Sequence, residues 1–247
     1  RRCLVGSEMC IRDRSRTTFA TGWAAVNAAR NMIKELKNRL SMIWEIEAEE
    51  IAFDNGNFSS KSDSELSINI RDLAKKLDGT GGPVSSVGSV DLDSSTHGFG
   101  THIVDLEIDP ETGKTDIIKY TAVQDVGRAI HPSYVEGQIQ GGAAQGIGWA
   151  LNEEYFINEK GKMLNSSYLD YRMPTALDLP MIDTILVENE NPEQPFGVRG
   201  VGEVPICPPL GAISNAIKDA LGIRLNDLPM KPSVILCLLY TSDAADE

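Results

Sequence analysis

The sequence is poor in several residue types, and each scarcity excludes a class of protein. It has 247 residues but only four cysteines, too few to suggest a disulfide framework. Lys and Arg number 23 against 36 Asp and Glu, a net charge of −13, which argues against nucleic acid or an anionic membrane as a partner. No apolar run approaches the length of a transmembrane helix. We therefore expect a globular protein with one large domain or two small ones.

The two ends of the chain differ from the rest. Residues 1–14 (RRCLVGSEMCIRDR) and 237–247 (CLLYTSDAADE) have no helical or alternating period that continues into their neighbours. Both strings resemble translated sequencing-adapter read-through, a contaminant of metagenomic assemblies. We expect residues 15–236 to be a fragment of a longer natural protein and the two ends to be artefacts. Cys207 is then the one native cysteine, and we expect a buried structural thiol.

No signal-peptide pattern precedes the fragment. We expect a cytoplasmic protein, and a periplasmic one stays open because the natural N-terminus is expected to be missing.

The first third of the chain predicts two helices and a hairpin. Apolar residues at three- and four-residue spacing indicate an amphipathic helix over residues 21–40, with Thr18 or Thr21 as its N-cap. Asp54-Asn55-Gly56 is a strong turn signal between two short strands. A short helix is expected over residues 67–77.

The middle of the chain carries the clearest β signal. Residues 102–108 and 115–124 alternate apolar and polar side chains around the turn 109–113, which predicts a hairpin. A strand pair is expected over residues 155–163 and a single strand over residues 182–188.

Two more helices are expected in the second half. Residues 137–151 include five glycines, each of which disfavours an isolated helix by roughly 1 kcal/mol. Such a helix needs close packing or a bound ligand to compensate. Residues 210–221 follow Pro208-Pro209 and stop at Gly222. Together the elements predict an α+β fold of mixed sheets and packed helices, with a division into two subdomains near residues 80–95.

The first candidate binding segment is Ser15, Arg16 and Thr17, directly before the first long helix. Free backbone N–H groups at a helix start, hydroxyls and a guanidinium together form an anion site. The alternative is a plain N-cap.

The second candidate is Gln138, near the expected start of the glycine-rich helix, because its amide can both donate and accept toward a ligand. The surrounding glycines do not reproduce the G-x-G-x-x-G fingerprint, so a nucleotide-binding dehydrogenase is unsupported. Tight helix packing is the expected role of Gly141, Gly142 and Gly146.

The third candidate is Glu203 in Gly200-Val-Gly-Glu-Val-Pro205, a lone carboxylate among valines, prolines and glycines. An apolar setting disfavours the charged form of a carboxylate, which suits a general base. The alternative is an exposed turn residue in a Gly/Pro loop. His97, His102 and His131 have no metal-ligand spacing, and we interpret them as surface histidines or supporting residues.

The segments together resemble a known family. Ser-Arg-Thr-Thr before a helix, EIDPETGK, DVGRAIHP, GQIQGGAAQGIG and GVGEVP occur in the order seen in the large, molybdopterin-binding subunit of molybdenum hydroxylases, the xanthine dehydrogenase and aldehyde oxidase family. The resemblance runs over residues 15–236 and corresponds to the C-terminal part of that subunit. The sequence departs from the pattern at His131, where asparagine is usual, and at Arg14, where glycine usually precedes the serine.

The resemblance implies a role for each candidate residue. Glu203 matches the glutamate that deprotonates the molybdenum-bound hydroxyl, and Gln138 matches a glutamine that hydrogen-bonds the pterin. Ser15 and Thr17 match hydroxyl residues that hold the pyranopterin and its phosphate, with Arg16 as a further contact. In this family no protein side chain binds the molybdenum, so no metal ligand is expected.

The resemblance also implies the reaction and the partners. The family oxidises aldehydes, N-heteroaromatics and related small molecules with oxygen taken from water. The expected cofactor is molybdenum-molybdopterin in its cytosine dinucleotide form, with [2Fe-2S] clusters and FAD on partner subunits. An iron–sulfur subunit, a FAD subunit and the large subunit would form a dimer of heterotrimers. The alternative is a catalytically inactive family member that acts in cofactor binding or maturation.

Overall fold

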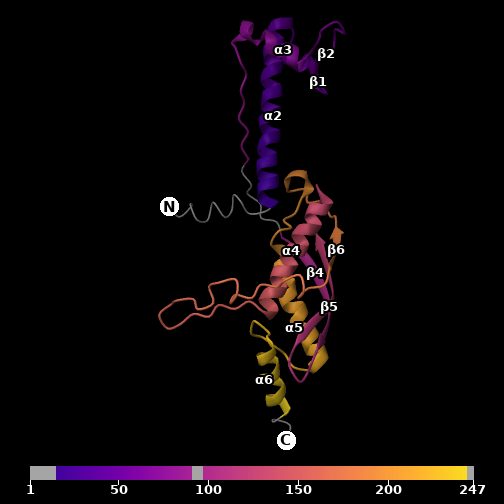
Figure 1. Ribbon diagram of the computed structural model, residues 1–247. Helices are drawn as coiled ribbons and strands as arrows, with labels where there is room; N and C mark the ends of the chain where they lie inside the picture. The colour runs from indigo at the N-terminus through magenta and orange to yellow at the C-terminus, as the bar shows by residue number, and fades with distance from the viewer. Residues whose placement is uncertain (1–14, 91–96, 244–247) are drawn as a thin grey trace. The chain divides into compact units, whose positions relative to one another are not determined.

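The computed structural model describes residues 15–90 and 97–243 (Figure 1), and side chains over 20–90, 97–194 and 196–241. The chain divides into two compact units. We call Thr17–Asp93 the N-terminal unit and Ser94–Glu247 the C-terminal unit. Each is described by itself.

The N-terminal unit consists of one long helix and a small antiparallel sheet. The helix α2 (Ser15–Trp44) is followed by β1 (Ile51–Asp54), β2 (Asn57–Ser60) and β3 (Ser67–Asn69), in the sheet order β1-β2-β3. Its core contains the buried Leu36, Leu40, Ile51, Phe58, Leu73 and Leu77.

Most predictions for this unit are confirmed, and two are wrong in detail. The hairpin turns at Asn55 and Gly56, whose φ angles of 44° and 81° are those its turn requires. The long helix already runs at Ser15, so Thr18 and Thr21 lie inside it and neither is its N-cap.

The second predicted helix of this unit is shorter than expected. Residues 67–69 form strand β3 instead, and α3 (Ile70–Lys76) begins after Asn69. The Asn69 side chain accepts hydrogen bonds from the N–H groups of Arg71 and Asp72, both at 3.0 Å, which explains the later start.

The C-terminal unit is a mixed three-stranded sheet with helices packed on one face. The strands β4 (Phe99–Ile108), β5 (Thr115–Asp125) and β6 (Ile182–Val187) have the order β4-β5-β6. The pair β4–β5 is the predicted antiparallel hairpin, whereas β6 pairs parallel to β5. Together with the helices this confirms the α+β class.

The helices α4 (Pro132–Leu151) and α5 (Pro208–Leu221) share one core with the sheet. Its fully buried side chains include Tyr120 and Ala122 of β5, Ile139 and Ala143 of α4, and Ile213 and Ile217 of α5. The other face of the sheet carries exposed apolar side chains such as Ile103, Ile118 and Ile185. The predicted helix end at Gly222 is confirmed by its φ of 75°.

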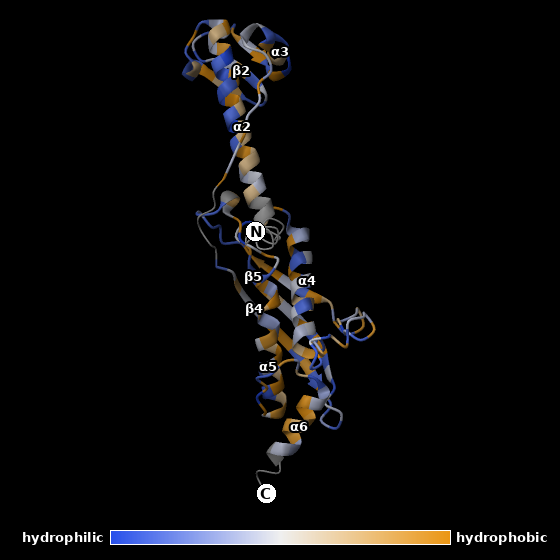
Figure 2. Ribbon diagram, turned by 90° about the vertical axis from the view of Figure 1, so that its left-hand side faces the viewer, coloured by the Kyte–Doolittle hydropathy of each residue, from blue (hydrophilic) through white to orange (hydrophobic). Residues whose placement is uncertain are grey.

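The structure differs from two expectations for this unit. The strand pair expected over residues 155–163 is reduced, within the described chain, to one isolated bridge between Ile157 and Met163. These residues belong to the long loop that projects from the C-terminal unit in Figure 1. In addition, residues 237–243 continue the helix α6 (Pro232–Asp243), so a helical period does cross residue 237; much of α6 is hydrophobic (Figure 2). That residues 237–247 are an artefact stays a prediction. Ile235 of α6 is fully buried and anchors the helix in the core.

Candidate functional site

The loop that carries Glu203 packs directly on α4 because α4 has no side chain at two positions. A β-carbon at Gly142 would lie 2.5 Å from Pro205 Cγ. At Gly146 a β-carbon would lie 2.7 Å from Pro209 Cγ and would also overlap the Ile206 carbonyl oxygen. Tight packing is therefore confirmed for Gly142 and Gly146. It is wrong for Gly141, where nothing lies within 4 Å of the β-carbon position.

Glu203 itself is exposed in this chain. The predicted dry, apolar setting is therefore wrong for the described residues. The reason is that its apolar neighbours Val201, Pro205 and Ile206 turn into the core, which leaves the carboxylate at the surface. The short 3-10 helix η4 (Val204–Ile206) begins directly after it, and the Ile206 N–H donates to the Glu203 carbonyl at 3.1 Å. Cys207, predicted to be buried, is exposed as well.

Gln138 is exposed and lies in the second turn of α4. The helix begins at Pro132 rather than near Gly137, since proline suits the first helical position. Gln138 is therefore not at the helix start. It lies one turn before Gly142, on the same face of α4. A β-carbon at Gly142 would also lie 3.5 Å from the carbonyl oxygen of Gly202, the residue before Glu203.

The third predicted segment forms the first turn of α2. Ser15, Arg16 and Thr17 are helical rather than lying before the helix. Their side chains fall outside the described part of the structure. Their proposed contact with an anion remains a prediction.

Sequence reasoning missed an ion pair that links the Glu203 loop to the end of β5. Arg199 Nε lies 3.0 Å from Asp125 Oδ2, and the two side chains are only 14% and 12% exposed. The other carboxylate oxygen of Asp125 accepts from the Gly127 N–H at 2.9 Å. Both residues lie in segments quoted in the sequence analysis: Asp125 opens DVGRAIHP, and Arg199 directly precedes GVGE. The sequence does not show that these two segments lie side by side in the folded protein.

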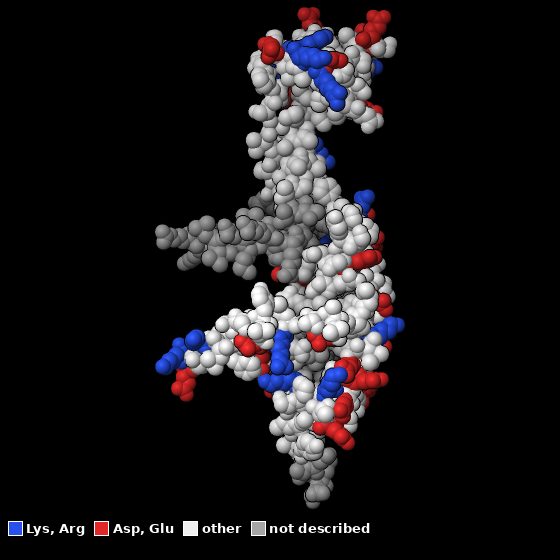
Figure 3. All heavy atoms as spheres, viewed as in Figure 1, with Lys and Arg blue, Asp and Glu red and all other residues white. Residues whose placement is uncertain are grey.

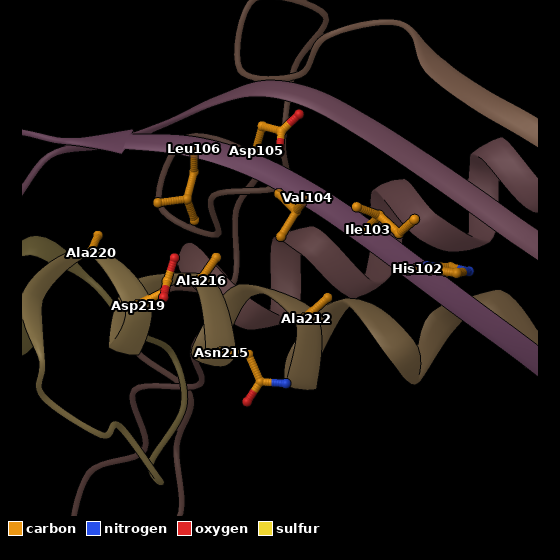
Figure 4. Close-up of a pocket in the computed structure, with 10 residues that line it drawn as sticks. All are labelled: His102, Ile103, Val104, Asp105, Leu106, Ala212, Asn215, Ala216, Asp219 and Ala220. Carbon is orange, nitrogen blue, oxygen red and sulfur yellow. The ribbon is translucent and has the colours of Figure 1, made fainter.

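A groove that does not include Glu203 lies between β4 and α5 (Figure 4). It has a volume of about 580 Å³ and is lined by residues 102–106 and by small or polar side chains of α5. None of the predicted site residues lines it.

His102 lies at one end of this groove and is buried, so of the two interpretations given above it is not a surface histidine. Its Nδ1 lies 2.8 Å from the Tyr120 hydroxyl. Burial lowers the pKa of His102 to about 4 because desolvation disfavours the charged ring. His97 and His131 are exposed.

Neither a metal-ligand cluster nor a membrane-spanning helix is found among the described residues. No group of three or more His, Cys, Asp or Glu side chains in that part is placed to hold a metal ion. No helix there is both long and apolar enough to cross a membrane. Acidic and basic side chains are interspersed on the face of the C-terminal unit in Figure 3.

The surroundings of Glu203 suit a large polar cofactor that approaches the backbone. The positions where Gly137, Gly141 and Gly200 would carry a β-carbon are open, with no atom within 4 Å. Gln124 is 1% exposed, and its Oε1 atom has no hydrogen-bond partner. Open glycines allow peptide groups to contact a ligand directly. The residues present therefore fit a pterin-type cofactor held by polar backbone and side-chain groups.

A family model described as the molybdopterin cofactor-binding domain matches residues 14–180. The chain belongs to this family. It is 31% identical, over 90% of its length, to the 6-hydroxypseudooxynicotine dehydrogenase complex subunit gamma of Paenarthrobacter nicotinovorans. It is 40% identical, over 62% of its length, to a putative xanthine dehydrogenase molybdenum-binding subunit of Escherichia coli K12. It spans 29% and 20% of those two proteins.

Solved structures agree with this assignment. A Cu,Mo-CO dehydrogenase matches 92% of this chain with a TM-score of 0.76 and 26% identity. The quinoline 2-oxidoreductase from Pseudomonas putida 86 matches 85% with a TM-score of 0.69 and 28% identity. The chain covers 30% and 28% of those structures. The match to molybdenum hydroxylase large subunits is the one expected from the sequence motifs.

Proposed function

We propose that the protein to which this chain belongs is a molybdenum-dependent hydroxylase in which Glu203 is the general base. The observation that carries the proposal is the placement of Glu203. It is exposed on a glycine-flanked loop that packs on α4 through Gly142 and Gly146. Gln138, the residue matched to a pterin contact, lies one turn of α4 away from Gly142. The relatives named above are dehydrogenases or oxidoreductases.

The overall reaction converts a C–H group and water into C–OH, two electrons and two protons. When bound, the molybdopterin group supplies the metal centre that accepts the two electrons. Glu203 accepts at a carboxylate oxygen the proton that water must lose as its oxygen joins the substrate. Gln138 donates and accepts hydrogen bonds that orient the pterin, and the open glycines let it lie close to the backbone.

The proposed substrates are aldehydes, N-heteroaromatics or related small molecules. The proposed cofactor form is the cytosine dinucleotide of molybdopterin, with Ser15, Arg16 and Thr17 as contacts to its anionic part. Electrons leave through [2Fe-2S] clusters and FAD on partner subunits, in a cytoplasmic dimer of heterotrimers. One relative is itself named as a subunit of a dehydrogenase complex.

The test is Glu203→Gln in the full-length protein with its partner subunits. We expect molybdenum content to stay unchanged while turnover with an artificial electron acceptor falls by about a hundredfold or more. Glu159→Gln is the matched control, because Glu159 is an exposed glutamate in the projecting loop. Near-normal turnover in Glu203→Gln would contradict the role of Glu203. A wild-type protein that holds molybdenum but oxidises no substrate would instead support the inactive, cofactor-binding alternative.

A further inference from the structure

Two neighbouring side chains at the end of β5, Gln124 and Asp125, contact the segment before Glu203. Asp125 pairs with Arg199 at 3.0 Å, and both side chains are largely buried. Gln124 Nε2 lies 3.4 Å from the carbonyl oxygen of Gly200. The attachment points on the loop are thus the consecutive residues Arg199 and Gly200, and Glu203 lies three positions after Gly200.

Backbone contacts join the same two segments. The Arg199 N–H donates to the Val126 carbonyl at 3.0 Å, and the Arg128 N–H donates to the Gly197 carbonyl at 3.0 Å. Gly127 has a φ of 63°, and its missing side chain leaves room for the Gly197 carbonyl. The two segments therefore approach too closely for any side chain to lie between them.

Arg199 also reaches a third segment. Its Nη1 donates to the His97 carbonyl at 3.3 Å, and its guanidinium carbon lies 5.7 Å from the centroid of the Phe99 ring. One side chain thus connects the start of β4, the end of β5 and the Glu203 loop. A planar guanidinium can make these contacts at once, whereas a lysine ammonium cannot.

The chain between Arg199 and Glu203 is flexible by composition. Two of the three intervening residues, Gly200 and Gly202, are glycines, and Gly200 has open space around it. The position of Glu203 therefore depends on the contacts that hold this stretch of chain. At the far end η4 packs on α4, and between the two ends Val201 is buried in the core. At the near end the Asp125–Arg199 pair adds a side-chain attachment to the backbone contact of Arg199 and to the contact between Gln124 and Gly200.

We propose that Asp125 and Arg199 are positioning residues that hold the Glu203 loop in its reactive geometry. Neither side chain is assigned a contact with substrate or cofactor, and both act through Glu203. This inference rests on the proposed function. It predicts that weakening the pair lowers kcat selectively, because a misplaced base costs transition-state stabilisation rather than substrate binding.

The experiment uses Asp125→Asn, Arg199→Lys and the double variant in the full-length protein with its partner subunits. We expect kcat to fall by about tenfold or more in each single variant, while KM changes by less than about twofold. Molybdenum content should match the wild type. The double variant should be no worse than the poorer single variant, since both substitutions break one interaction.

A second readout is independent of turnover. In the cofactor-free protein, amide hydrogen exchange over residues 200–204 should be faster in Asp125→Asn, while exchange in β5 stays unchanged. Glu154→Gln is the matched control, because Glu154 forms a partly buried ion pair with Lys231 that joins other segments of the same unit. That variant should leave both kcat and exchange at 200–204 unaltered.

The outcomes separate the two proposals. Unchanged kcat in Asp125→Asn and Arg199→Lys would overturn the positioning role, even if Glu203→Gln is inactive. A loss of molybdenum content in parallel with kcat would also overturn it, because the pair would then serve the cofactor site as a whole. If Glu203→Gln is fully active, the proposed function itself fails.

Discussion

The carbonyl oxygen of Ile206 occupies the space that a side chain at Gly146 would need. This relationship places the loop that follows Glu203 against the backbone of α4. It also explains why glycine is needed at position 146 despite its low helix propensity.

Gly146→Ala should therefore destabilise the C-terminal unit. The new methyl group must displace Ile206 or Pro209, and overpacking of this kind costs about 1–3 kcal/mol. Chemical unfolding of the full-length protein measures the change. Gly141→Ala is the control in the same helix, because its β-carbon enters open space, and it should stabilise by up to about 1 kcal/mol. The same sign for both variants would contradict the packing argument.

The buried His102 should make stability depend on pH. Its folded-state pKa of about 4 lies below the ordinary value of 6.5, so the unfolded chain binds the proton first. The stability contribution is fully present above about pH 6.5 and is lost progressively as pH falls toward 4. Urea unfolding midpoints between these values measure it. The change of the unfolding midpoint with pH should be smaller in His102→Gln. It should be unaltered in His131→Gln, since His131 is exposed.

The helix α6 should contribute to the core through one face. Ile235→Ala removes a fully buried side chain and should cost about 2–5 kcal/mol. Leu238→Ala, on a position that is 37% exposed, should cost less than about 1 kcal/mol. Thermal unfolding of both variants tests whether α6 packs as described. Equal losses would show that it does not.

The N-cap of α3 should support the N-terminal unit. Asn69→Ala removes the acceptor for two backbone N–H groups and should cost about 1 kcal/mol. Asn69→Ser keeps a capping oxygen and should recover most of the loss. Hydrogen exchange of the α3 amides measures both variants, and full protection in Asn69→Ala would argue against the cap.

Local chemistry explains which elements were predicted correctly. The hairpin at Asn55-Gly56 and the helix end at Gly222 depend on backbone angles that glycine and asparagine adopt readily. Alternation of side chains identified β4 and β5. The strand pair predicted over residues 155–163 does not form in the described chain, where one isolated bridge joins Ile157 and Met163.

The environment of single side chains was not predictable in this way. Glu203 and Cys207 lie among apolar residues in sequence, yet both are exposed, because Val201, Pro205 and Ile206 take the buried positions. His102, an unremarkable histidine in the sequence, is buried against Tyr120. Neighbours along the chain do not reveal which side of a loop faces the core.

The sequence alone determined the family, the class of fold and the residues proposed for chemistry, because motif order, periodicity and turn residues are properties of the chain itself. Only the tertiary structure decided that β6 runs parallel to β5 and that Asp125 pairs with Arg199. Gln124 and Gly200, which meet in the same region, are 76 residues apart. Contacts over such separations follow from how the whole core packs, and no local pattern records them.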